Sequence, residues 1–255
     1  MVIPIKWKLF GVLLLGLMAL VSIPKVQGND VGGVMTFTDD TGDKWFNDVK
    51  NFVEIISSQP HWYQGFLKDY PNVGSYMWIE EDYGGQDNNY ADYTELSLVL
   101  GHSCVYNNEI GIGFGDKGCA LPEKVRLGYK SPDGYGWAIW TFIIQCSVLN
   151  DNNVNNWLEA LAGIHMILGF AKEAKIALGD ATELAYRLTG TGGYPKESVH
   201  DAFFDTYVAY DGTHNDNIAR IIAENAEVAD NDYLDSFDRY IPVDSTKIII
   251  TCSLG

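Results

Sequence analysis

The sequence predicts an α/β protein, a three-layer α/β/α sandwich with a mainly parallel sheet. Two observations support this fold class. Residues 96–100, 136–146 and 163–170 are nearly continuous apolar segments, which is typical of strands that are buried on both faces. Segments with helical spacing of apolar residues lie between or after these strands, and alternation of this kind favours a parallel sheet with both faces covered.

The first half of the chain contains most of the expected alternation. Apolar residues recur at helical spacing over residues 43–57, with Asp43 as the expected cap. We expect a strand at 32–38, that helix, an aromatic connection between Pro60 and Pro71, a short strand at 76–79 and a strand at 96–100.

The second half begins with residues 103–135, whose glycines predict an irregular insertion with a hairpin. The elements expected after the strand that ends at Cys146 are a helix at 157–162, a strand at 163–170, helices at 180–188 and from Pro195 to about 210, a mixed segment at 218–228 and an end strand at 247–251. No low-complexity linker divides the chain, so we expect one domain over residues 29–255.

The first 28 residues resemble an export signal. Lys6 and Lys8 precede an apolar run over residues 9–23, and Val26-Gln-Gly28 offers small residues before a cleavage point. The run is short for a membrane span of roughly 20 residues, so we expect a cleaved signal peptide at 1–28 and a secreted or cell-surface protein. An uncleaved membrane anchor is the alternative.

The composition restricts the partners. Hydrophobic residues make up 47% of the chain, which is globular, and 17 basic against 34 acidic residues give a net charge of −17. Such a surface repels phosphates and anionic lipids. We therefore expect no nucleic-acid partner, and membrane contact only through the leader if it stays uncleaved.

Export would allow the four cysteines to form two disulfides. Cys104 and Cys119 lie in one glycine-rich insertion, so a local bridge between them is plausible. Cys146 and Cys252 both end apolar runs, where buried free thiols are common.

The candidate site consists of His102 and Cys146, which follow two of the apolar strands. If these strands are parallel neighbours, the imidazole and the thiol lie side by side at the carboxyl edge of the sheet. A cysteine beside a base is the arrangement of an activated nucleophile.

These two strand ends, Leu98-Val-Leu-Gly-His102 and Phe142-Ile-Ile-Gln-Cys146, resemble those of the caspase, gingipain and legumain-like cysteine peptidases, in the same order and at a similar spacing. The stretch Trp157…Gly163-Ile-His165…Leu168-Gly-Phe170 also resembles an uncharacterised family of secreted prokaryotic proteins with that fold. The resemblance covers roughly residues 30–240. It implies a caspase-like sheet and a peptide or protein substrate, with Cys146 as nucleophile and His102 as the acid that protonates the leaving amine. Backbone N–H groups near His102 and at Cys146 would hold the oxyanion, where Ser103 replaces the usual glycine.

Four carboxylates are candidate substrate-binding residues. Asp39 and Asp40 follow the first expected strand, and Glu80 and Glu81 follow the short strand expected at 76–79. On the edge that carries Cys146, they would favour a substrate with Arg or Lys before the scissile bond. They are alternatively solvated charges, or ligands of a structural calcium ion. Otherwise we expect no cofactor and no metal.

A second functional class remains open, a non-catalytic extracellular protein that keeps the fold and binds a surface ligand. Its contact surface would be the aromatic loops, whose members are Trp62, Tyr63, Tyr83, Tyr90 and Tyr93. His165 lies early in its strand, at the opposite edge from Cys146, and is interpreted as a hydrogen-bonded core histidine.

Overall fold

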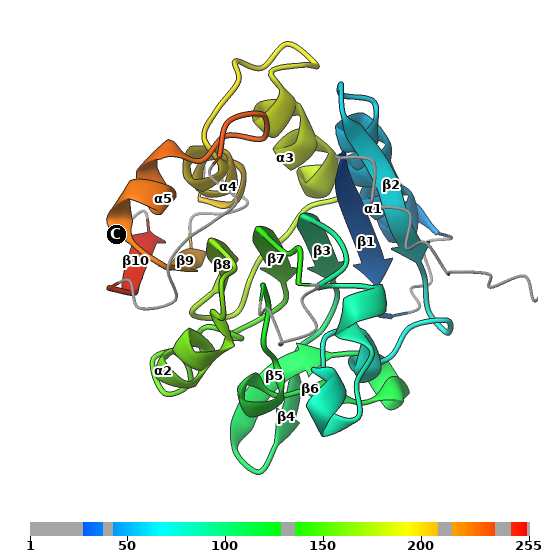
Figure 1. The fold of residues 1–255 in the computed structure, drawn as a ribbon, viewed down its shortest axis with the longest axis vertical. Coiled ribbons are helices and arrows are strands. Elements are labelled where there is room, and N and C mark those ends of the chain that lie inside the picture. The colour runs from blue at the N-terminus through cyan, green and yellow to red at the C-terminus, as the bar shows by residue number, and fades with distance from the viewer. Residues whose placement is uncertain (1–27, 38–42, 129–135, 209–215, 238–245, 254–255) are drawn as a thin grey trace, which may run out of the picture.

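The computed structural model describes residues 28–37, 43–128, 136–208, 216–237 and 246–253. They form a seven-stranded sheet in the order β10-β9-β8-β7-β3-β1-β2 (Figure 1). Its strands are β1 (Asn29–Met35), β2 (Trp62–Lys68), β3 (Leu96–Leu100), β7 (Trp140–Ile144), β8 (Met166–Phe170), β9 (Ile218–Ala223) and β10 (Ile248–Ser253). The first five run parallel, β9 is antiparallel to β8, and β10 is antiparallel to β9. The predicted α/β class with a mainly parallel sheet is confirmed.

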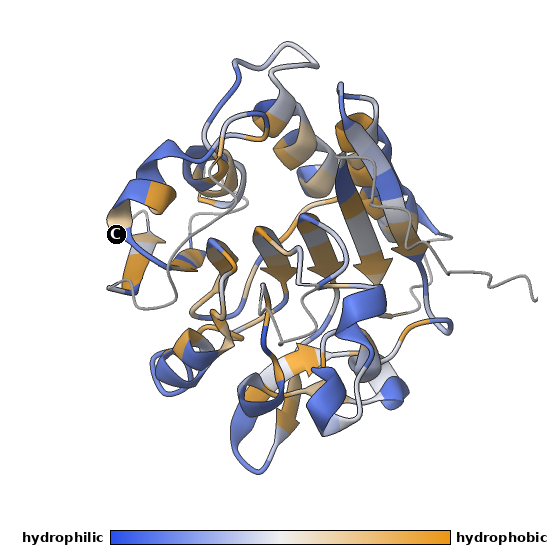
Figure 2. Cartoon of the chain, viewed as in Figure 1, coloured by the Kyte–Doolittle hydropathy of each residue, from blue (hydrophilic) through white to orange (hydrophobic). Residues whose placement is uncertain are grey.

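The two faces of the sheet are covered differently. On one face lie α1 (Lys44–Ser57), α3 (Asp180–Thr189), α4 (Val199–Tyr207) and α5 (Ala226–Asn231), whose apolar sides share a core cluster with the strands (Figures 1 and 2). The other face packs against α2 (Val154–Trp157), several 3-10 turns and a small sheet of β4 (Cys104–Tyr106), β5 (Glu109–Gly113) and β6 (Cys119–Ala120). The second layer is therefore mostly short elements.

Alternation along the strands assigns side chains to these faces. Leu100 of β3 and Ile144 of β7 belong to the core on the helical face, whereas Val99 and Ile143 belong to the core on the other face. All four are buried. Strands that are apolar on both sides can only be accommodated between two layers.

Several local predictions are wrong. Residues 76–79 are not a strand, because residues 75–77 form a 3-10 turn, and the edge strand β2 lies in the expected aromatic connection. Three successive residues of β2 from Tyr63 are exposed, which hides the apolar pattern of a strand. Asp43 makes no side-chain cap, and α4 begins at Val199 because the Ser198 hydroxyl accepts the N–H of Asp201 at 3.1 Å.

The predicted leader, residues 1–27 of it at least, lies outside the described residues. No helix in the part of the chain that the structure describes is both long and apolar enough to span a bilayer.

Candidate functional site

Strands β3 and β7 are parallel neighbours, as the candidate site requires. Their register pairs Leu100 with Ile144, and the N–H of Gly101 donates to the carbonyl of Ile144 at 3.2 Å. His102 and Cys146 each stand two residues beyond this last pair. They therefore lie at equivalent positions on one edge of the sheet.

The contacts of the two side chains place them on the same face. The His102 ring lies 5.0 Å from the ring of Phe37, and Sγ of Cys146 lies 3.4 Å from the N–H of Ala174. Phe37 and Ala174 both pack against the core of the helical face. His102 is exposed and Cys146 is half-buried, so solvent reaches this edge of the sheet.

The backbone around Cys146 forms a sharp turn. Ser147 has φ 58°, a left-handed conformation that is uncommon for a residue other than glycine. The turn is held because the N–H of Ser147 donates to the carbonyl of Lys172 at 2.8 Å. Backbone strain of this kind concentrates at functional sites. The same bond occupies the Ser147 N–H, so this group is not free to bind a ligand.

Gln145 is a residue of this region that the sequence prediction did not assign to the site. It is only 1% exposed, and its side-chain amide bonds to the backbone of Gly113 in β5, with the N–H of Gly113 donating to Oε1 at 2.9 Å and Nε2 donating to the carbonyl at 3.0 Å. A polar side chain in an otherwise apolar strand, directly before the candidate nucleophile, was the available signal.

The small sheet begins next to His102. A disulfide joins Cys104 to Cys119, which confirms the local bridge, and Cys146 and Cys252 are free thiols. Ser103, half-buried between His102 and this disulfide, occupies the predicted position, and its role stays a prediction.

The four carboxylates do not form one group in the structure. Asp39 and Asp40 lie outside the described residues. Glu80 precedes the 3-10 turn η2 (Glu81–Tyr83), and its N–H donates to the carbonyl of Lys124. The strand that was expected to carry Glu80 and Glu81 to the sheet edge is absent, so their substrate-binding role stays a prediction without that support.

Glu80 belongs to a group of acidic residues whose charges affect one another, with Asp82, Asp87 and Asp92. Burial, and next the charge of Asp82, raise the pKa of Glu80. Burial, and next the charge of Glu80, raise the pKa of Asp87 to about 8. Burial also raises the pKa of Asp92, whose Oδ1 accepts the N–H of Gly128 at 2.6 Å. Among the described residues no three or more His, Cys, Asp or Glu side chains are placed to hold a metal ion.

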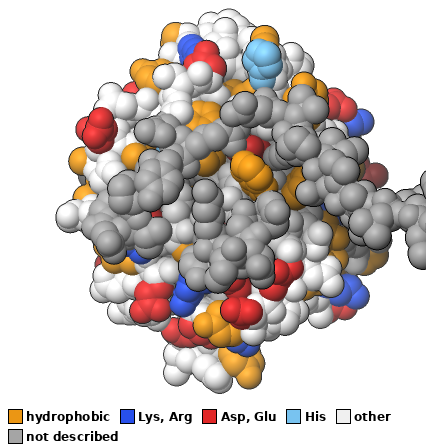
Figure 3. Space-filling view, in the orientation of Figure 1, with side chains coloured by type: hydrophobic (Ala, Val, Ile, Leu, Met, Phe, Trp, Pro, Cys, Tyr) orange, Lys and Arg blue, Asp and Glu red, His pale blue; other side chains and the backbone are white. Residues whose placement is uncertain are grey.

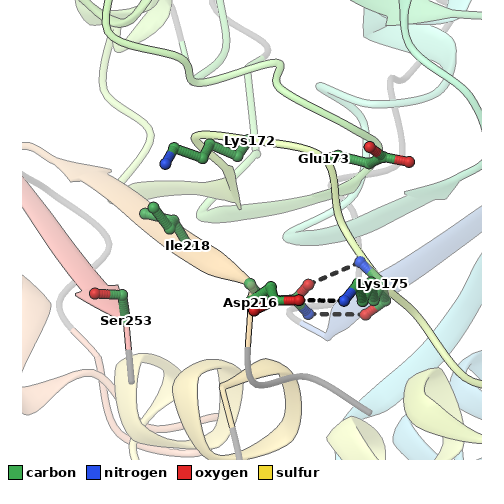
Figure 4. A pocket seen from close by; sticks show the side chains of 7 residues that line it. Lys172, Glu173, Lys175, Asp216, Ile218 and Ser253 are labelled. Carbon is green, nitrogen blue, oxygen red and sulfur yellow. Dashed lines mark hydrogen bonds and ion pairs between the residues drawn. The ribbon is translucent and has the colours of Figure 1, made fainter. Parts of the chain in front are cut away.

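Two hollows flank the turn at Cys146. One, of about 470 Å³, is lined by Lys172, Glu173, Lys175, Asp216, Asn217, Ile218 and Ser253 (Figure 4). In it Lys175 pairs with Asp216, and the buried Asn217 side chain bonds to the backbone of Lys175. The other, of about 320 Å³, is lined by Asn108, Glu109, Ile110, Ser147, Asn150, Asp151, Asn152, Asn153, Asn156 and Ala171.

Acidic side chains occur at several separate places on the face seen in Figure 3. This distribution agrees with the net charge of −17.

His165 lies in the core, as the sequence indicated. It is fully buried, and its Nδ1 lies 2.5 Å from Oδ2 of Asp232. The same carboxylate oxygen accepts the indole N–H of Trp140 at 2.8 Å. His165 precedes β8 and therefore lies at the amino edge, away from Cys146.

Comparison with known proteins identifies the family. The model of DUF6345, a domain of unknown function, matches residues 35–250, and the chain belongs to this family. An "Uncharacterized protein" of Archaeoglobus fulgidus is 60% identical over 236 residues, which are 91% of this chain and 89% of that protein. The predicted likeness to an uncharacterised prokaryotic family is thus confirmed.

Among solved structures, a chain of the Saccharomyces cerevisiae separase–securin complex is similar with a TM-score of 0.33 and 13% identity. The match covers 68% of this chain and 10% of that chain, so the present chain spans about a tenth of its length.

Proposed function

We propose that the protein is a secreted cysteine peptidase that uses His102 and Cys146. One observation supports this most strongly: His102 and Cys146 follow paired ends of the adjacent parallel strands β3 and β7, and each contacts a residue that packs on the helical face. Two chemically competent side chains at one carboxyl edge are the usual construction of a site in an open α/β sheet. Signal peptide 1–28 would deliver the enzyme outside the cell or to its surface.

The proposed reaction is amide hydrolysis in two steps. The Cys146 thiolate attacks the carbonyl carbon, an S–C bond forms, and the C–N bond breaks as His102 gives its proton to the leaving amine. Water then attacks the thioester carbonyl carbon and gives a proton to His102, the C–S bond breaks, and the acid leaves with the Cys146 thiolate and protonated His102 restored. The N–H of Ala174, 3.4 Å from Sγ, would stabilise negative charge on the sulfur.

A preference for Arg or Lys before the scissile bond is the finer part of the proposal. Asp39 and Asp40 follow Phe37 by two and three residues, and the Phe37 ring is 5.0 Å from that of His102. The sequence position of the two carboxylates, just after a residue in contact with His102, is what supports this preference. Fluorogenic Arg, Lys and Asp peptides test this preference, and faster cleavage after Asp would contradict it. A structural calcium ion at the acidic loops is proposed only as an alternative use of these groups.

The peptidase proposal is tested by thiol alkylation of the reduced protein. We expect iodoacetamide to label Cys146 at least about tenfold faster in the wild type than in His102→Ala, because the imidazole promotes the thiolate. Cys252, half-buried on β10, is the internal reference. An inert Cys146, or labelling that does not depend on His102, would remove the peptidase reading.

The exposed tyrosines favour a second candidate, a non-catalytic binding protein. Tyr63 and Tyr83 are about half exposed, and Tyr93 is also exposed, whereas Trp62 is buried and Tyr90 is half-buried. Exposed aromatic side chains are typical of contact surfaces. Under this proposal His102→Ala and Cys146→Ser would leave binding to a surface ligand unchanged.

A further inference from the structure

We propose that Gln145 is a positioning residue, which sets the separation of His102 and Cys146 by clamping both strand ends to one residue of the small sheet, Gly113. This inference rests on the proposed function, because positioning matters only if His102 and Cys146 react together. The clamp, which consists of the contacts of Gln145 and His102 with Gly113, can be tested without any catalytic assay.

The first half of the clamp joins the end of β7 to β5. Gln145 uses both ends of its amide on the peptide groups of Gly113, at 2.9 Å and 3.0 Å. Two bonds to one residue fix its orientation as well as its distance, as in a paired strand. Nε2 also lies 3.4 Å from Oγ1 of Thr36, at the end of β1.

The second half joins β5 to the end of β3. The backbone of Gly113 touches that of His102: a Cβ at this glycine would stand 2.2 Å from the carbonyl oxygen of His102 and 2.8 Å from the carbonyl carbon of Ser103. No side chain fits there without a backbone shift. A shift of Gln145 would therefore move Gly113, and with it the backbone of His102.

The small sheet is held together by strand pairing and by the disulfide. Gly113 pairs with Cys119 of β6, and Cys119 is bonded to Cys104, two residues after His102. Cys104 in turn pairs with Gly111 of β5. The path from Cys146 through Gln145, Gly113 and the disulfide to His102 thus closes a ring of short, fixed links.

Such a ring has a chemical consequence. Nucleophile and base must be held to well within 1 Å, because a misplacement of about that size costs on the order of a hundredfold in rate. Burial of a polar amide at the end of an apolar strand is costly unless every bond is made. Gln145 makes its two amide hydrogen bonds to Gly113 of β5, the strand whose backbone contacts that of His102.

The test uses cross-linking, which does not depend on catalysis. In the Cys252→Ser background, the substitution His102→Cys places a second thiol at the end of β3. Neighbouring strands lie roughly 4.8 Å apart, within the Cα separations that a disulfide spans. Diamide oxidation of the full chain, followed by peptide mass spectrometry, gives the rate at which this thiol joins Cys146.

We expect Gln145→Met to slow this cross-link at least about tenfold, since the strand ends lose their common anchor. The matched control is Thr141→Val, also buried on β7, which removes a hydrogen bond to Ser97 at 2.5 Å but lies away from the edge. Its rate should stay within about twofold of the parent. If Gln145→Met does not fold, Gln145→Glu replaces it, because a charged carboxylate keeps the volume and cannot donate to the carbonyl of Gly113.

The outcomes separate the two proposals. Equal cross-linking rates in the Gln145 variant and the parent overturn the positioning role, whatever the enzyme does. Slower cross-linking together with Cys146 labelling that is independent of His102 supports the clamp and removes the peptidase. If both hold, Gln145→Met with the native His102 should also lower the His102-dependent labelling of Cys146.

Discussion

The two edges of the sheet each contain a histidine, and the two sites differ in almost every physical respect. At the amino edge His165 is fully buried against Asp232, and Trp140 bonds to the same carboxylate. At the carboxyl edge His102 is exposed, and its ring contacts Phe37. A buried and hydrogen-bonded histidine contributes to folding, whereas the ring of an exposed one can be reached by solvent and solutes.

The comparison shows that the same residue type has opposite expected phenotypes at the two edges. Changes at the amino edge should lower stability, and changes at His102 should lower reactivity alone. Five variants test where stability and reactivity reside, ordered by their expected effect on the free energy of unfolding.

The largest loss is expected for Asp232→Ala. It leaves the imidazole of His165 and the indole N–H of Trp140 buried without their shared acceptor, which costs about 3–5 kcal/mol. Urea denaturation measures this loss. The control is Asp235→Ala, because Asp235 pairs with Lys196 with its side chain 68% exposed and should change stability by less than about 0.5 kcal/mol. Equal effects of the two variants would refute the structural role of the buried network.

Removal of the disulfide by Cys104→Ser with Cys119→Ser comes next. The bridge closes a sequence separation of 15 residues, for which loop-closure entropy predicts about 3 kcal/mol. Cys252→Ser closes no loop and serves as the control. Because the hairpin touches His102, the double variant should also reduce His102-dependent alkylation of Cys146. Unchanged alkylation would show that the hairpin only stabilises the fold.

An intermediate and pH-dependent effect is expected at Asp87, whose pKa is raised from 3.8 to about 8. The folded state keeps this carboxyl protonated while the unfolded state ionises, so its contribution is complete below about pH 4 and is lost as the pH rises to 8. Asp87→Asn should therefore be more stabilising, or less destabilising, at pH 8 than at pH 4. Thermal melts across this range check the sign.

Asp216 provides the opposite sign for comparison. A hydrogen bond from Lys175 lowers its pKa, so its contribution is present above its ordinary value and is lost in acid. Because the side chain is exposed, Asp216→Asn should have only a small effect on the free energy of unfolding.

The Asp87 prediction has a clear contrary outcome. If Asp87→Asn is less stable than the wild type at pH 8, the ionised carboxylate of Asp87 must have a partner in the folded protein.

The smallest change in stability is expected for His102→Ala, within about 0.5 kcal/mol, because an exposed side chain loses little on truncation. The same variant is expected to show the largest loss of Cys146 reactivity. If His102→Ala lowers the melting temperature as far as Asp232→Ala does, His102 has a structural role like that of His165.

The sequence by itself determined the elements whose signals are local. The apolar runs of β3, β7 and β8, the helical spacing of α1, and the position of two candidate side chains at strand ends all follow from residues that are close in the chain. The Cys104–Cys119 bridge was also accessible, because both cysteines belong to one insertion. Burial in a parallel sheet imposes these patterns on short segments.

Only the tertiary structure decided the rest. β2 escaped prediction because an edge strand exposes one side, so Tyr63 and its neighbours show no apolar alternation. The strand expected at 76–79 is a 3-10 turn, because a short apolar stretch forms either a strand or a turn, depending on what packs on it. Gln145 meets Gly113 32 residues away, and His165 meets Asp232 67 residues away. Such contacts are set by how the layers assemble, and no local pattern records them.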